Sequence, residues 1–127
     1  MNLKNQVPEL ELCRDIPDGC FADSALLWRK HQELWQINAE WQIVIRTAFP
    51  SRQNIYSAPT LPEIMAEIGK VREAPTVYWD GAQWTVECEA VNCIEQNRFE
   101  DKKNPANAAI KLWLEVTKGE RGNEICI

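Results

Sequence analysis

PTVYWDGAQWTVECE, residues Pro75 to Glu89, is the stretch that decides the fold, because an Asp80-Gly81 pair separates two runs of alternating polar and apolar residues. Both central residues of a two-residue type I′ turn need a positive φ, which glycine adopts freely and aspartate tolerates better than most residues. The stretch therefore predicts a β-hairpin whose turn is Asp80-Gly81.

The predicted turn also decides which side chains share a face, because successive side chains of a strand point to opposite sides of a sheet. Trp79 should lie opposite Ala82, and Val77 opposite Trp84. The face expected to be buried carries Val77, Trp79, Ala82, Trp84, Val86 and Cys88. The face expected to be in water carries Thr76, Tyr78, Gln83, Thr85, Glu87 and Glu89.

A second alternating region, Leu34–Thr47, also predicts β-structure. It is longer than a usual strand, so two arrangements are open. In the first, the strand breaks near Asn38-Ala39. In the second, a hairpin pairs Ala25–Arg29 with Leu34–Ile37. The residues of this region expected to face the core are Trp35, Ile37, Ala39, Trp41, Ile43 and Ile45.

Three other segments are expected to be helical, and the second and third have the spacing of apolar residues that is typical of amphipathic helices. Thr60 can cap the second of them, because Glu63 stands three residues later and completes a capping box. Asn104-Pro105 can open the third, and Gly69 and Gly119 are expected to end the second and the third. The expected helices are Pro8–Asp15, Leu61–Gly69 and Pro105–Lys118. The polar face of the third is expected to carry Asn107, Lys111, Glu115 and Lys118.

These elements predict the class of the fold. Two amphipathic helices and a sheet with one apolar face bury their apolar surfaces together when both helices lie on the same side of the sheet. We therefore expect a single two-layer α+β domain over residues 1–127, with an antiparallel sheet, two helices on one face, and frayed ends at about 1–7 and 120–127.

Composition narrows the possible partners. The chain of 127 residues is 45% hydrophobic and 26% charged, with a net charge of −5, which argues against a nucleic-acid partner. It has no apolar run long enough for a membrane span, and its first residues do not form a signal peptide, so we expect a cytoplasmic protein without a membrane partner. The possible partners are then another protein or a second copy in a homodimer.

The glycines and the single histidine do not predict a catalytic centre. Phosphate-binding loops need several glycines close together, whereas the five glycines here are spread along the chain. His31 lies in a predicted turn, and no spacing places it beside a cysteine nucleophile. Glu87 and Glu89 share a face that is expected to be solvated, whereas a catalytic pair of carboxyl groups needs one member to be buried. We expect no catalytic residue and no cofactor.

The five cysteines predict reduced thiols rather than a disulfide framework or a metal site. Neither Cys13 with Cys20 nor Cys88 with Cys93 has the tight spacing of a zinc knuckle. Cys13 and Cys88 are expected to be buried as small apolar side chains, and Cys126 to be exposed. We expect no metal ligand.

Four segments in this order resemble a family of small uncharacterised proteins that phages, prophages and mobile elements of gut bacteria carry. They are LELCRDIPDGCFADSALLW, YSAPTLPEIMAEIG, the W-x-x-x-x-W hairpin and NPANAAIKLWLE, which together span most of the chain. The family has no assigned activity, so the resemblance implies a genomic context and no site residue.

The sequence favours a non-enzymatic accessory or protein-interaction module over an enzyme. Its most plausible binding surface is the sheet face that the helices leave uncovered, because that face mixes a tyrosine and an arginine with polar neighbours. The candidate residues are Tyr78, Arg46, Val44, Gln83, Thr85 and Glu87. The alternative is a small enzyme, or an enzyme subunit whose active site a partner chain completes.

Overall fold

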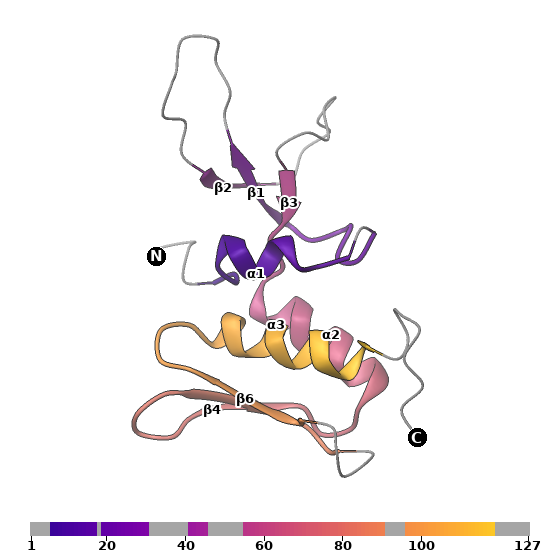
Figure 1. Cartoon of the computed structure of the whole chain (residues 1–127), viewed down its shortest axis with the longest axis vertical. Coiled ribbons are helices and arrows are strands. Elements are labelled where there is room, and N and C mark those ends of the chain that lie inside the picture. The colour runs from indigo at the N-terminus through magenta and orange to yellow at the C-terminus, as the bar shows by residue number, and fades with distance from the viewer. Residues whose placement is uncertain (1–5, 18, 31–40, 46–54, 91–95, 119–127) are drawn as a thin grey trace, which may run out of the picture.

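The computed structural model of the chain describes residues 6–17, 19–30, 41–45, 55–90 and 96–118 (Figure 1). In these ranges the helices are α1 (Leu10–Arg14), α2 (Leu61–Val71) and α3 (Pro105–Val116). The strands are β1 (Leu26–Lys30), β2 (Trp41–Ile45), β3 (Ile55–Ser57), β4 (Thr76–Trp79), β5 (Trp84–Glu87) and β6 (Arg98–Asp101).

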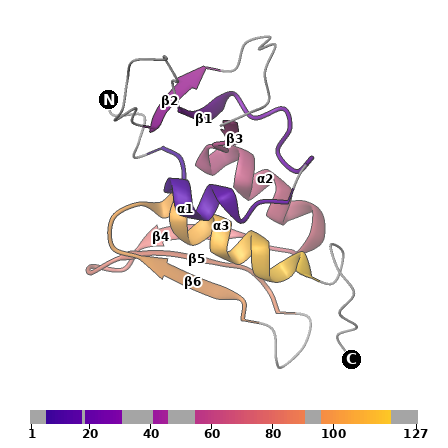
Figure 2. The same ribbon diagram turned by 45° about the horizontal axis from the view of Figure 1, so that its top comes forward.

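The strands form two antiparallel three-stranded sheets with the orders β2-β1-β3 and β4-β5-β6. The helices lie between the two sheets, and α2 and α3 run side by side over one face of β4-β5-β6 (Figures 1 and 2). The predicted α+β class, the antiparallel pairing and the two helices on one face are confirmed. In the described part of the chain, β1 and β5 each have a neighbour on both edges, and no strand belongs to both sheets.

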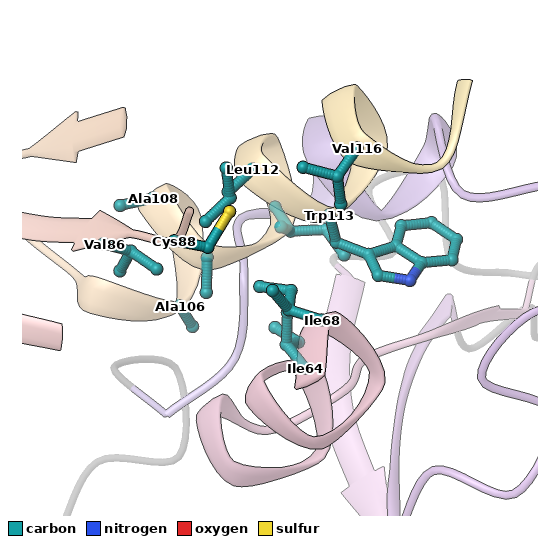
Figure 3. Close-up of a cluster of buried hydrophobic side chains, with 11 residues drawn as sticks. Ile64, Ile68, Val86, Cys88, Ala106, Ala108, Leu112, Trp113 and Val116 are labelled. Carbon is teal, nitrogen blue, oxygen red and sulfur yellow. The ribbon is translucent and has the colours of Figure 1, made fainter. Parts of the chain in front are cut away.

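The main core lies where α2 and α3 meet the inner face of β5 (Figure 3). Ile64 and Ile68 of α2 are fully buried there, and Val86 and Cys88 lie across from them. The contributions of α3 are Ala106, Ala108, Ala109, Ile110, Leu112, Trp113 and Val116. The burial expected for Cys88 is confirmed.

Helix α3 is buried on more sides than its sequence predicts. Asn107, expected on a solvated face, is almost completely buried. Its Oδ1 accepts a hydrogen bond from the Glu9 amide at 2.8 Å, and its Nδ2 donates to Asp101 Oδ2 at 3.3 Å. The prediction was wrong because the segment that leads into α1 covers this side of α3, and the amide supplies the hydrogen bonds that burial requires.

A second core joins α1 to the β2-β1-β3 sheet and contains Val7, Cys13, Leu26, Trp28 and Ala58. Val7 is fully buried, so the expectation of a frayed end is wrong at this residue. The indole of Trp28 donates to the Pro8 carbonyl at 3.1 Å. Burial raises the pKa of the Cys13 thiol to about 12, against a smaller lowering by its hydrogen bond with Trp28. Cys13 is therefore a packing residue, as expected.

Helix α2 begins as predicted and ends later. The Glu63 Oε1 accepts both the Thr60 amide at 2.8 Å and the Thr60 hydroxyl at 2.9 Å, which confirms the capping box. Gly69 does not end the helix, which continues to Val71. A glycine inside a helix costs only about 1 kcal/mol, and the packing of Val71 against the main core outweighs that cost.

Strand β1 pairs with a later segment than the predicted hairpin requires. Leu26 lies opposite Ile45 and Trp28 opposite Ile43, so the partner of β1 is Trp41–Ile45 rather than Leu34–Ile37. In this register Trp28 lies opposite Ile43, and both residues belong to the second core. The expected hairpin would have placed Leu34–Ile37 opposite β1 instead. The predicted break at Asn38-Ala39, the predicted turn at His31 and the tail 120–127 lie outside the described residues.

Candidate functional site

The β4–β5 hairpin forms as predicted, but its register differs by two residues. Trp79 lies opposite Trp84 and Val77 opposite Val86, so the loop is Asp80–Gln83 instead of Asp80-Gly81. A shift of two leaves every side chain on its predicted face.

The longer loop forms because Asp80 bonds to the loop's own backbone. Its Oδ1 accepts from the amides of Ala82 and Gln83, both at 2.9 Å, while the Asp80 amide donates to the Gln83 carbonyl at 3.1 Å. Only Gly81 in this loop has a positive φ, of 101°, whereas a type I′ turn requires one at Asp80 as well. The carboxylate therefore selects the wider loop.

The Asp80 hydrogen bonds predict a pH-dependent hairpin. The two loop amides lower the pKa of this carboxyl from its usual 3.8. A lowered folded-state pKa stabilises the fold at pH values above the unfolded-state pKa, and this stabilisation is lost as the pH falls through the folded-state value. In Asp80→Asn the side chain no longer titrates, so stability should fall less steeply below about pH 4 than in the parent. Urea unfolding at a series of pH values measures this, and equal slopes for the two proteins would contradict it.

The two faces of this sheet are not simply one dry and one wet. Thr85, expected in water, is fully buried, and Trp79, expected in the core, is 50% exposed. Thr85 is in the central strand between Tyr78 and Glu100, and its hydroxyl lies 3.5 Å from Asp80 Oδ2. Trp79 is in edge strand β4, whereas α3 packs on β5 and β6. Position within the sheet, not residue type, explains both corrections.

The outer edge of β4 presents backbone groups that pair with no strand in the described part of the chain. Residues of an antiparallel pair alternate between those that exchange hydrogen bonds with the neighbouring strand and those that do not. The Asp80 amide bonds to the Gln83 carbonyl, and Tyr78 is two residues before Asp80 in the same alternation. The backbone groups of Tyr78 therefore also bond toward β5. Val77 and Trp79 therefore direct their N–H and C=O groups outward.

The two edges of this sheet differ in charge. Strand β6 has the sequence RFED, and charged residues on an edge oppose pairing with another chain. Strand β4 has the sequence TVYW and carries no charge. Tyr78 is 36% exposed and Trp79 50%, one on each face of this edge, and they are the exposed large hydrophobic residues among the side chains that the structure describes. We call Val77, Tyr78, Trp79 and the backbone of β4 the β4 edge.

The predicted binding face is only partly assembled. Tyr78, Gln83, Thr85 and Glu87 do share the helix-free face of β4-β5-β6. Val44 belongs to β2 in the other sheet, and Arg46 lies outside the described residues. The residue that sequence reasoning missed is Trp79, which was assigned to the core. The signal that identifies it is an uncharged aromatic strand at the edge of its sheet.

Polar side chains on the helix-free face mostly bond to one another. The amide of Gln83 donates to Glu100, and the Arg98 guanidinium lies 3.3 Å from Glu100 Oε1. Asp80 accepts from the loop and from Thr85. These side chains hold the sheet together, so the edge offers more unused bonding capacity than the face.

A groove beside α2 is the place where an enzyme site could be sought. It is lined by loop residues 19–24, by Glu63, Ala66 and Glu67 of α2, and by Trp113. Glu63 caps α2 and also accepts the Ala25 amide at 3.1 Å, while Glu67 pairs with Lys70 at 2.8 Å. Cys13 and Asp80, whose pKa values are displaced, both lie outside this groove. Both α2 carboxylates of the groove therefore have structural partners.

Within the described ranges, no group of three or more His, Cys, Asp or Glu side chains is placed to hold a metal ion. The helices described here include none that is long and apolar enough to cross a membrane. Comparison of the chain with protein-family models, with curated proteins and with solved structures finds no match.

Proposed function

We propose that this protein is a non-enzymatic protein-interaction module that binds an extended segment of a partner along the β4 edge. Val77 and Trp79 direct backbone groups outward, and Tyr78 and Trp79 expose aromatic rings at the same place. This combination carries the proposal. Added strands gain affinity from main-chain hydrogen bonds and specificity from alternate side chains. The β4 edge supplies both kinds of contact.

The aromatic residues make binding at this edge energetically useful. Tryptophan and tyrosine are the side chains that most often dominate interface energies. Trp79 already rests edge-on against Trp84, with ring centroids 5.5 Å apart, so it is held in place before a partner arrives. Covering its exposed half would contribute about 2 kcal/mol from apolar burial.

The alternative of a small enzyme has less support. A catalytic cleft needs titratable side chains free to act on a substrate. In the groove beside α2, both carboxylates of the helix are engaged in capping or ion pairing. A phage or mobile-element origin, which the resemblance of the sequence implies, is consistent with an accessory binding module.

Selection from a displayed library of random peptides of about ten residues tests the proposal. The parent protein should enrich peptides with alternating apolar residues. Binding should be lost in Trp79→Pro, because proline removes an outward N–H of the β4 edge. Trp79→Lys, which keeps the amide, should weaken binding at least about tenfold through the loss of aromatic contact.

Arg98→Pro is the matched control. The Cys88 amide bonds to the Asn97 carbonyl at 3.0 Å, so Arg98 directs its own amide outward from β6. This variant also places proline at an exposed edge position, and it should bind the selected peptides as the parent does. Failure of a monomeric parent to enrich any peptide, or equal loss in Trp79→Pro and Arg98→Pro, would contradict the proposal.

A further inference from the structure

We infer that the segment which occupies the β4 edge is β4 of a second copy of this chain, so that two β4-β5-β6 sheets join into one antiparallel six-stranded sheet. The inference rests on the proposed function, because it uses the same edge. It adds the identity of the partner and the register of the pairing.

The outward backbone groups select one symmetric register. In an antiparallel pair related by a two-fold axis, Val77 and Trp79 both bond fully only when Val77 of one copy lies opposite Trp79 of the other. A pairing centred on Val77 would bring Pro75 opposite Trp79, and proline has no N–H to donate. A pairing centred on Trp79 would bring Val77 opposite Gly81, inside the loop. The selected register is therefore centred on Tyr78.

Side chains are complementary in this register. On the helix-free face, Tyr78 lies opposite Tyr78 of the second copy, at a non-hydrogen-bonded position where side chains approach most closely. On the other face, Val77 lies opposite Trp79 of the second copy, so two apolar side chains meet. The same pairing covers Tyr78 and Trp79, the exposed large hydrophobic residues among the described side chains.

Charges are complementary as well. The nearest ionised group, Asp80, lies opposite Thr76 of the second copy, whose hydroxyl can donate to a carboxylate. By symmetry, the pair of Asp80 and Thr76 occurs at both ends of the two joined β4 strands. No two carboxylates face each other between these strands. Strand β6 instead carries the charged side chains of Arg98, Glu100 and Asp101, and charged residues on an edge strand oppose pairing with another chain. The uncharged β4 edge is the one that fits a second copy.

Sedimentation equilibrium over a range of protein concentrations tests the inference. The parent should shift from a mass of 14.7 kDa at low concentration toward twice that value at high concentration. The net charge of −5 on each copy opposes association, so added salt should strengthen the dimer. Arg98→Pro should dimerise as the parent does.

Charge substitution at Tyr78 tests the register. Tyr78→Lys and Tyr78→Glu should each weaken the dimer at least about tenfold, because identical charges would then face each other at the two-fold axis. An equimolar mixture of the two variants should form a dimer of one copy of each, because lysine then faces glutamate. A mixture that stays monomeric would overturn the register, as would a parent dimer that neither variant weakens.

The outcomes separate the two proposals. A parent that stays monomeric at every concentration, yet binds selected peptides in a way that Trp79→Pro abolishes, would overturn the dimer and leave the proposed function standing. A dimer that neither the Tyr78 variants nor Trp79→Pro weakens, in a protein that binds no peptide, would overturn both.

Discussion

Replacing Trp113 by alanine is expected to lower the free energy of unfolding by about 3–5 kcal/mol. The side chain is only 6% exposed, and it lies in the main core with its ring edge-on to Phe21 at 4.8 Å between centroids. Alanine would leave a cavity between α3 and the loop that contains Phe21. Surrounding elements close such cavities only in part, so both the lost burial and the cavity destabilise the fold.

Trp79→Ala is the matched control for this substitution. The same change at a 50% exposed side chain on an edge strand should cost about 1 kcal/mol. Urea unfolding followed by far-ultraviolet circular dichroism measures both variants. Equal losses would show that Trp79 is a core residue, and the candidate binding surface would lose its main side chain.

The second large effect is expected for Asn104→Ala, at about 2–4 kcal/mol. Asn104 Oδ1 accepts from the Ala106 amide at 2.8 Å and caps α3, while its Nδ2 donates to the Val7 carbonyl at 2.6 Å. Both bonds are buried. The substitution therefore removes a helix cap and also a link between α3 and the N-terminal segment that covers it.

Asn104→Ser separates the two roles of this side chain. Serine can keep the capping acceptor but cannot donate to the Val7 carbonyl in the same way, so we expect a loss between those of the parent and the alanine variant. Denaturant midpoints for the three proteins provide the comparison. If the serine variant is as stable as the parent, the bond to Val7 contributes nothing. If the serine variant is as unstable as the alanine variant, the cap contributes nothing.

Local features of this fold were predictable because they depend on residues close together in the sequence. Thr60 and Glu63 are three residues apart, and they form the capping box that this spacing predicts. The alternation around Asp80 predicts a hairpin and its faces. The loop length was not predictable from the Asp-Gly pair alone, because the Asp80 carboxylate can also bind the amides of a wider loop.

Features that depend on position within a sheet were not predictable in this way. Alternation assigns a side chain to a face, but it does not say whether its strand is central or at an edge. Thr85 is buried because its strand has a neighbour on each side, and Trp79 is exposed because its strand has only one in the described structure. The same limit explains Val44, which has a suitable parity but belongs to the other sheet. The candidate site changed from a sheet face to a sheet edge for this reason.

Hydrogen exchange at individual backbone amides tests the central claim, that the β4 edge binds an added strand, most directly. In dilute protein the outward amides of Val77 and Trp79 should exchange fast, as should those of Arg98 and Glu100 on the opposite edge. With a selected peptide at saturating concentration, exchange at Val77 and Trp79 should slow at least about tenfold, while Arg98 and Glu100 stay unchanged. Unchanged exchange at Val77 and Trp79 in the complex, or equal slowing at both edges, would contradict the account.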